Sequence, residues 1–247
     1  MNIALVTGVS RGIGRATALQ LAARGYCVAV NYHQRADAAA EVVRQIEQAG
    51  GRAFSVQADI ADEAQVVAMF QYIDSQPGTL TALVNNAGIL FQQSTLEELT
   101  AERINRVFRT NVTGTFICCR EAIKRMAHHH GGNGGAIVNV SSAASRTGAP
   151  GEYVDYAASK GAMDTLTRGL SLEVAALGVR VNGVRPGCIY TEMHADGGEA
   201  GRVDRLASAI PMQRGGQVEE IANAIVWLLS EEASYITGSN IDAAGGR

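Results

Sequence analysis

Short apolar, β-branched runs alternate along this chain with longer stretches of helical periodicity, and this alternation constrains the fold more than any other feature. The predicted strands are 3–7, 27–32, 53–58, 82–86, 136–141, 179–184 and 240–243. The predicted helices are 13–24, 36–49, 62–75, 100–127, 153–177 and 218–230. This order predicts an α/β fold with a doubly wound sheet of about seven mostly parallel strands, right-handed crossovers and helices on both faces.

The composition indicates one domain over residues 1–247, because no proline-rich or serine-rich linker and no repeat divides the chain. The net charge of −3 predicts no nucleic-acid partner and no attraction to acidic membranes. The segment MNIALVTG lacks the charged region of a signal peptide, and no run approaches the ~20 apolar residues of a membrane span. Four cysteines without metal-ligand spacing predict free thiols and a cytoplasmic location.

Two segments look irregular. Residues 128–135 read HHHGGNGG and are expected to form an exposed loop, with the histidines at a solvated helix end and no metal bound. Residues 192–210 hold three glycines in a polar stretch between a strand and a helix. This segment is either a substrate lid or an ordinary surface loop, and the sequence leaves both alternatives open.

The first predicted strand ends in TGVSRGIGRATALQL, with Gly8, Gly12 and Gly14 at the turn into a helix. Glycine lets a backbone turn tightly and approach a pyrophosphate, while the helix N-terminus offers free N–H groups and a positive dipole end. A glycine-rich turn without a ligand is the alternative. The strand before the turn and the helix after it favour a Rossmann-type dinucleotide site.

Several further motifs accompany the T-G-x-x-x-G-x-G spacing of this turn: NNAG at 85–88, NVSS at 139–142, YAASK at 156–160 and RPGCIYTEM at 185–193. In these motifs the sequence resembles the short-chain dehydrogenase/reductase family, in its compact single-domain branch. The resemblance runs from residue 1 to 236–246 and is nearest to bacterial members described as glucose- or sugar-dehydrogenase-like, a description that says little about the substrate. It implies interconversion of a carbonyl and a secondary alcohol by hydride transfer.

The end of the second predicted strand bears on the choice of cofactor. A site for NAD usually places an acidic residue there to bind the ribose 2′-hydroxyl, but this sequence has Asn31 and Tyr32. Arg11 lies in the glycine turn, where the family often has a basic residue that meets a 2′-phosphate. These two features favour NADP(H) over NAD(H).

The resemblance implies further cofactor contacts. Asp59, with Ile60, corresponds to the aspartate that meets the adenine amino group, and NNAG corresponds to the turn beside the adenine ribose. The segment after the sixth predicted strand corresponds to the surroundings of the nicotinamide carboxamide. The complete set of predicted cofactor residues is Gly8, Ser10, Arg11, Gly12, Ile13, Gly14, Asn31, Tyr32, Asp59, Ile60, Asn85, Ala87, Gly88, Lys160, Pro186, Gly187, Ile189 and Thr191.

Tyr156 and Lys160 are four residues apart and project from one face of the predicted helix 153–177. A lysine ammonium favours a tyrosinate, so Lys160 is expected to lower the pKa of Tyr156. A change from about 10 to about 7 needs roughly 4 kcal/mol of differential stabilisation. Tyr156 would then act as the general acid/base, and the resemblance implies that Lys160 also binds the nicotinamide ribose.

Two more catalytic residues come from the resemblance. Ser142 of NVSSAAS corresponds to the serine that stabilises the substrate oxygen, although its offset of 14 residues from Tyr156 keeps its neighbours Ser141 and Ser145 as alternatives. Asn111 of RTNVTGTF corresponds to the helix asparagine that positions a water beside the lysine. The predicted sites all follow strands at one edge of the sheet, where ligands bind in open α/β folds.

The leading hypothesis is therefore an NADP(H)-dependent oxidoreductase acting on a small-molecule carbonyl or alcohol. The alternatives are a catalytically silent NADP-binding sensor or scaffold and a 3-ketoacyl-thioester reductase. The resemblance implies a homotetramer or homodimer formed through the helices 100–127 and 153–177. The substrate pocket is expected to involve residues after NNAG, the segment 143–153 and the segment 192–210 with His194, and the substrate itself stays open.

Overall fold

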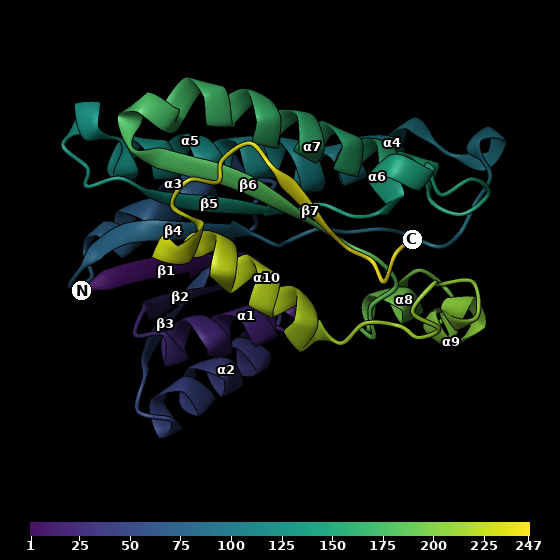
Figure 1. Ribbon diagram of the computed structural model, residues 1–247, viewed down its shortest axis with the longest axis horizontal. Helices are drawn as coiled ribbons and strands as arrows, with labels where there is room; N and C mark the ends of the chain where they lie inside the picture. Colours follow the sequence, from purple (N-terminus) through teal and green to yellow (C-terminus); the bar gives the residue numbers. More distant parts are fainter.

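A computed structural model describes residues 1–247 and contains one sheet of seven parallel strands in the order β3-β2-β1-β4-β5-β6-β7 (Figure 1). The strands are β1 Asn2–Val6, β2 Cys27–Tyr32, β3 Arg52–Gln57, β4 Thr79–Asn85, β5 Gly135–Val140, β6 Val179–Pro186 and β7 Asn240–Ala243. The larger helices are α1 Gly12–Ala23, α2 Ala36–Gln48, α3 Glu63–Asp74, α4 Ala101–Phe108, α5 Thr115–Met126, α7 Val154–Val174 and α10 Val218–Leu229. The predicted α/β fold is confirmed.

Helices cover both faces of the sheet because successive residues of each buried strand point to opposite sides. In β1, Ile3 and Leu5 join a core cluster with α3, α5 and α7, whereas Ala4 and Val6 join a second cluster with α1, α2 and α10. Figure 1 shows the two groups of helices on opposite sides of the sheet. The apolar strands predicted from the sequence are thus apolar because each contributes to two cores.

The order of the strands reverses between β1 and β4, which are neighbours in the sheet although three crossovers separate them in sequence. From β1 the chain proceeds outward through β2 and β3, and then returns to β4 and proceeds the other way. The loops after β1 and β4 consequently diverge to opposite faces and leave a crevice at the carboxyl ends of the strands. The glycine turn and NNAG lie on either side of that crevice.

The predicted helix 100–127 is divided into α4 and α5 by a π-type segment, Arg109–Gly114, in which the helix widens. Gly114 ends this segment, and a Cβ there would lie 2.6 Å from the backbone oxygen of Ile60. Close packing against the loop after β3 therefore accompanies the widening. The π-type segment contains Asn111, and such segments are frequent at functional sites.

The two irregular segments are ordered. His128–His130 form an exposed 3₁₀ turn after α5, and the left-handed Gly131 ends it. The segment 192–210 contains two short helices, α8 Met193–Asp196 and α9 Arg202–Ala207, which lie at one end of the molecule near the C-terminus (Figure 1). A helix α6, Ala144–Thr147, follows β5. None of the helices combines the length and the apolarity that crossing a membrane requires.

Candidate active site

Two adjoining cavities open at the carboxyl ends of the strands. The first, here called the outer groove, has a volume of about 660 Å³ and extends from the glycine turn to the loops after β2 and β3. The second, the inner cavity, has a volume of about 450 Å³ and extends from Tyr156 to α8 and α9. The two cavities share the lining residues Ile13, Asn86, Gly88, Thr191 and Met193 and so form one continuous site.

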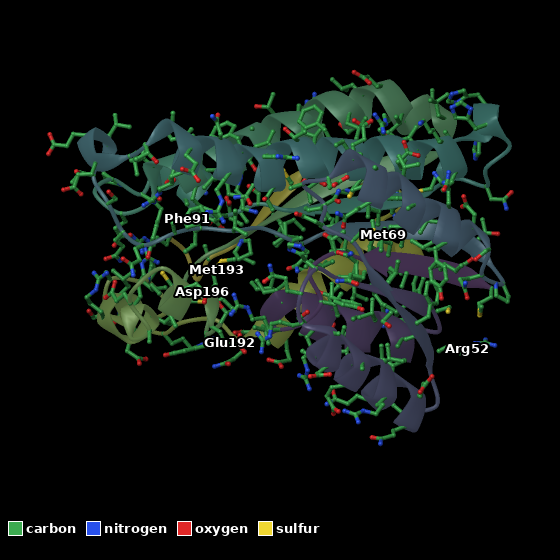
Figure 2. All side chains as sticks on the ribbon, turned by 180° about the vertical axis from the view of Figure 1, so that it is seen from behind. Arg52, Met69, Phe91, Glu192, Met193 and Asp196 are labelled. Atoms are coloured by element: carbon green, nitrogen blue, oxygen red, sulfur yellow. The ribbon has the colours of Figure 1, made fainter.

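Figure 2 shows how the edges of this site are arranged. Phe91, which follows β4, lies at the same end of the molecule as Met193 and Asp196 of α8. Arg52, the first residue of β3, lies at the opposite end. The site is therefore confined to the carboxyl end of the sheet, as the parallel topology requires.

The glycine turn is held against the end of β4. Gly8 has a φ of +68°, and a Cβ on it would lie 2.9 Å from Cα of Ala87, so only glycine fits. A Cβ on Gly14 would lie 2.4 Å from Nδ2 of Asn86, which donates hydrogen bonds to the backbone oxygens of Thr7 at 2.9 Å and Gly8 at 3.0 Å. The turn thus brings backbone close to whatever occupies the groove.

Helix α1 begins directly at this turn, and no side chain caps its N-terminus. Its first N–H groups and its positive dipole end are therefore directed at the outer groove, an arrangement that suits a phosphate. The residues present thus fit a dinucleotide, since the groove combines a glycine turn, a helix N-terminus and basic side chains.

Most predicted cofactor residues line the continuous site. The outer groove is lined by Gly8, Ser10, Arg11, Gly12, Ile13, Asn31, Asp59, Ile60, Ala87, Gly88 and Thr191. The inner cavity is lined by Lys160, Pro186, Gly187, Ile189 and Thr191 among the predicted set.

Three predicted cofactor residues do not line either cavity. Asn85 is buried in β4, where its Nδ2 donates to Oδ1 of Asn139 at 2.9 Å, and its neighbour Asn86 lines the cavities instead. Tyr32 packs against the core cluster under α1 and α2. Gly14 lies in α1 and packs against Asn86 and the backbone of Gly8. The alternation of side chains along a strand explains the positions of Asn85 and Tyr32, because adjacent residues face opposite sides.

Basic side chains surround the outer groove. Arg11 pairs with Asp196 of α8, and His33, Arg35, Arg106 and Arg109 also line the groove. The last two residues of β2, Asn31 and Tyr32, carry no carboxylate, and Asn31 accepts a hydrogen bond from the backbone N–H of Gly8 at 3.3 Å. At this end of β2, an NAD site would have an acidic side chain to bind the ribose 2′-hydroxyl. Here the amide side chain of Asn31 binds the glycine turn instead.

Tyr156 and Lys160 lie side by side on α7 and both line the inner cavity. The Nζ atom of Lys160 is 5.5 Å from the ring centre of Tyr156. Lys160 is almost completely buried, and its ammonium donates a hydrogen bond to the backbone oxygen of Val140 at 2.7 Å. The end of β5 therefore fixes the position of the lysine.

The pKa values of this pair differ from the sequence prediction that Lys160 lowers the pKa of Tyr156. Burial raises the pKa of Tyr156 to about 12, opposed by a hydrogen bond with Ser142 and by the charge of Arg202. Burial likewise lowers the pKa of Lys160 to about 8, opposed by the carboxylate of Asp164. Desolvation is the largest cause of both shifts, because burial disfavours the charged form of each side chain.

The two serines after β5 have different partners. Ser142 lies beside Tyr156 and lowers its pKa, and its hydroxyl accepts a hydrogen bond from the backbone N–H of Ala144 at 3.1 Å. The hydroxyl of Ser141 is buried and donates to the backbone oxygen of Lys160 at 3.1 Å. Of the two, Ser142 is thus the serine that stands beside the tyrosine hydroxyl, and Ser141 fastens β5 to α7.

Asn111 does not line either cavity but lies behind the site. Its amide donates to the backbone oxygen of Ile89 at 2.9 Å and accepts from the N–H of the same residue at 2.8 Å. It also donates to Oγ of Ser159 at 3.0 Å. A Cβ on Gly88 would lie 3.4 Å from Oδ1 of Asn111 and 3.5 Å from Nζ of Lys160, so both groups approach the same point.

The sequence did not single out several residues that line the inner cavity, among them Asn86, Tyr153, Arg202 and Arg247. Asn86 is part of the NNAG motif, but whether Asn85 or Asn86 faces the cavity depends on the direction in which each side chain points at the end of β4. Tyr153 and Arg202 lie within the segments 143–153 and 192–210 that were expected at the substrate pocket, but no motif picks out either residue. Arg247 directly follows the segment 236–246 and was not predicted. The fold alone brings them to Tyr156.

Comparisons with known proteins agree with this geometry. Residues 8–247 match the family model described as enoyl-(acyl carrier protein) reductase. The chain is 74% identical, over the full length of both proteins, to the uncharacterized oxidoreductase YgfF of Escherichia coli K12. It is 41% identical to the 3-oxoacyl-[acyl-carrier-protein] reductase FabG of Staphylococcus aureus, over 98% of this chain and 96% of the relative.

Glucose 1-dehydrogenase 2 of Bacillus subtilis is 37% identical over 98% of this chain and 93% of its own length. These relatives are all oxidoreductases by name, yet they differ in the compounds that their names give as substrates. Together with the sheet order and the glycine turn, they show that the chain belongs to the short-chain dehydrogenase/reductase family and is an oxidoreductase acting on CH–OH groups.

Proposed function

We propose that the protein is an NADP(H)-dependent oxidoreductase that interconverts a small carbonyl compound and a secondary alcohol, with Tyr156 as the general acid/base. The observation that carries the proposal is that Ser142, Tyr156 and Lys160 lie together in a cavity continuous with a groove fit for a dinucleotide. When bound, the nicotinamide supplies or accepts the hydride. The remaining chemistry is the movement of one proton and the stabilisation of charge on one oxygen.

Tyr156 holds the proton that the substrate oxygen receives on reduction. Its pKa of about 12 keeps it protonated at neutral pH, so it is ready as an acid. Ser142 adds a hydroxyl beside it, which stabilises charge developing on the substrate oxygen. A tyrosine with this pKa is a poor acid, so a nearby cation is needed to lower the barrier of proton loss.

Lys160 provides that cation in its protonated form. Its pKa of about 8 means that the ammonium predominates below pH 8 and is lost above it. Asn111 holds the backbone of Ile89, and its Oδ1 atom and the Nζ atom of Lys160 both approach Gly88. We propose that this asparagine positions the groups through which Tyr156 is reprotonated.

The preference for NADP(H) over NAD(H) is supported by the charges in the outer groove. Arg11 is in the glycine turn and Arg35 follows β2, and the nearest strand end carries no carboxylate that would repel a phosphate. Guanidinium groups bind phosphate through charge-assisted hydrogen bonds. Arg11 and Arg35 would hold the 2′-phosphate.

The decisive experiment replaces Tyr156 by Phe. We expect kcat to fall by at least about 10³-fold while the dissociation constant for NADPH changes less than about threefold, because the variant loses only the proton donor. Ser145→Ala is a matched control, since Ser145 lies nearby but its hydroxyl bonds the backbone oxygen of Ser142. Turnover of Tyr156→Phe close to that of the wild type would refute the assignment, and a catalytically silent sensor would show no turnover in the wild type either.

A second candidate reaction is the reduction of 3-oxoacyl thioesters. The observation that favours it is the 41% identity to a protein named for that reaction over nearly the whole chain. Acetoacetyl-coenzyme A and a panel of free ketones and sugars, assayed with NADPH and NADH, would distinguish the two. Efficient turnover of the thioester alone would favour this second candidate.

We further propose that the protein is cytoplasmic and forms a homodimer or homotetramer, and that the segment 192–210 acts as a substrate lid. Phe116 on α5 and Leu172 on α7 are 49% and 66% exposed, and large apolar side chains exposed on neighbouring helices favour an interface. Size-exclusion chromatography with light scattering would measure the mass. A monomer at micromolar concentration would contradict the proposed assembly.

A further inference from the structure

Arg202 is the first residue of α9 and lines the inner cavity together with Tyr156. Its side chain is only 14% exposed. One Nη atom pairs with Glu152, and the guanidinium lies over the ring of Tyr153 at 5.5 Å from the ring centre. The Nε–H group is buried and has no hydrogen-bond acceptor. A charged donor without a partner is costly to bury, and a structural role alone does not explain it.

Arg103 on α4 shows how a purely structural arginine is paired in this protein. It is 17% exposed, and its Nε donates to Asp155 at 2.8 Å while Nη2 donates to the same carboxylate at 3.3 Å. Its remaining Nη atom donates to the backbone oxygen of Gln92 at 2.7 Å. Arg103 therefore uses the Nε–Nη edge that is characteristic of a carboxylate pair, whereas Arg202 uses only one half of that edge.

The charged side chains that line the inner cavity are predominantly positive. Among its lining residues, Lys160, Arg202 and Arg247 are cationic, and Glu152 alone is a carboxylate. Glu152 is shared between Arg202 and the exposed Arg205, which also pairs with Glu199. The cavity therefore presents positive charge to its contents, and at about 450 Å³ it suits a small molecule.

From these observations we infer that the substrate carries a carboxylate besides its reacting carbonyl group, and that Arg202 is the specificity-determining residue that binds it. This inference rests on the proposed function and gives the class of substrate: a small oxo acid, or the corresponding hydroxy acid. A carboxylate is the planar acceptor that fits the Nε–Nη edge, and the Nε–H group of Arg202 has no other acceptor.

Arg202 is close enough to the reacting groups for one molecule to reach both. Its charge lowers the pKa of Tyr156 and that of His194, which also lines the cavity. Burial is the larger influence on His194 and likewise lowers its pKa, so this side chain is neutral and adds no competing charge at neutral pH. A substrate whose carbonyl meets Tyr156 thus has its carboxylate directed toward α9.

The test compares oxo acids of four to six carbons, with the carbonyl at position 2, 3 or 4, against their methyl esters. Wild type, Arg202→Met, Arg202→Lys and Arg205→Met are assayed with NADPH. Arg205→Met is the matched control, because Arg205 pairs with the same Glu152 but does not line the cavity. NADPH dissociation constants and melting temperatures of all four proteins establish that the variants are folded.

We expect the wild type to favour at least one acid over its ester by roughly 10- to 100-fold in kcat/KM, the range of a hydrogen-bonded charge pair. Arg202→Met should lose this preference by reduced activity on the acid, with the ester within about threefold of wild type. Arg202→Lys keeps the charge without the planar edge and should lose about 3- to 10-fold on the acid. It serves as the test if the Met variant does not fold.

Equal losses on acid and ester in Arg202→Met, or the same pattern in Arg205→Met, would show that Arg202 acts through α9 or the pKa of Tyr156 rather than on a substrate carboxylate, and would overturn the inference. So would efficient, Tyr156-dependent reduction of uncharged ketones with no oxo acid accepted, and in that case the proposed function stands. If the wild type reduces no carbonyl compound and oxidises no alcohol, the proposed function fails, and the inference fails with it.

Discussion

Replacing Gly14 by Ala and Gly169 by Ala makes the same chemical change at two helical positions, and the structure predicts opposite results. A Cβ on Gly14 would lie 2.4 Å from Nδ2 of Asn86 and 2.6 Å from the backbone oxygen of Gly8. Around Gly169, on the exposed side of α7, nothing lies within 4 Å of the added atom. The pair therefore separates close packing of the cofactor turn from intrinsic helix propensity.

The magnitudes follow from these contacts. Ala at position 14 displaces the Asn86 amide, which loses its two hydrogen bonds to the turn at about 1 kcal/mol each. The contact with the Gly8 oxygen adds overpacking strain of roughly 1–3 kcal/mol, because backbone yields less than a flexible side chain. After subtraction of about 1 kcal/mol for the better helix propensity of Ala, Gly14→Ala should destabilise the fold by about 2–4 kcal/mol. Gly169→Ala should stabilise it by about 1 kcal/mol, the difference in helix propensity.

Urea unfolding followed by circular dichroism, with NADPH binding measured by calorimetry, checks both variants. For a chain of this length, a change of 1 kcal/mol in the free energy of unfolding corresponds to a change of about 2–4 °C in melting temperature. We also expect the Gly14→Ala protein to bind NADPH at least about 10-fold more weakly, since the turn is displaced. A stability of Gly14→Ala within about 0.5 kcal/mol of wild type would refute the steric reasoning, and destabilisation by Gly169→Ala would show that α7 is covered there in solution.

Three further predictions concern the charges and hydrogen bonds of the site. Asp164→Asn removes the carboxylate that raises the pKa of Lys160, so this pKa should fall further below its ordinary value. The basic limb of the profile of kcat/KM against pH should therefore move to lower pH by roughly half a pH unit. An unchanged profile would contradict this prediction. Arg11→Ala should weaken NADPH binding by about 10- to 100-fold and NADH binding by less than about threefold. Asp196→Asn frees Arg11 from its ion pair and should tighten NADPH binding by up to about fivefold. Calorimetry with both cofactors measures these changes, and equal effects on the two cofactors would exclude contact of Arg11 with the 2′-phosphate. Asn111→Leu removes three hydrogen bonds, worth roughly 3 kcal/mol, and should lower the melting temperature by about 6–12 °C. A melting temperature within about 1 °C of wild type would be incompatible with the bonds described.

Much of the fold could be predicted because it depends on local patterns. The apolar strands and the helical periods are visible in the sequence, and the seven observed strands overlap the seven predicted runs. Their ends differ by up to three residues: β4 begins at Thr79 rather than 82, since polar threonines at a strand's start carry no apolar signal. The π-type segment around Asn111 was not predictable, because the widening depends on packing against the loop after β3 rather than on residue type.

The candidate site was predictable where a motif lies in one continuous segment. Tyr156 and Lys160 face the same cavity because residues four apart share a helix face. Adjacent residues on a strand or at its end were the weak point, since a shift of one residue reverses the direction of a side chain. This is why Asn85 is buried in the core while Asn86 lines the site, and why Ser141 and Ser142 have different hydrogen-bond partners although both line the inner cavity.

The sequence by itself therefore determined the α/β class, the glycine turn and the chemical type of the reacting residues, since each depends on contacts within a few positions. The tertiary structure alone decided the environment of those residues. Burial raises the pKa of Tyr156 and lowers that of Lys160, and long-range packing brings Arg202 of α9 into a cavity with them. Desolvation and electrostatic interaction depend on distances through space, and no spacing along the chain encodes them.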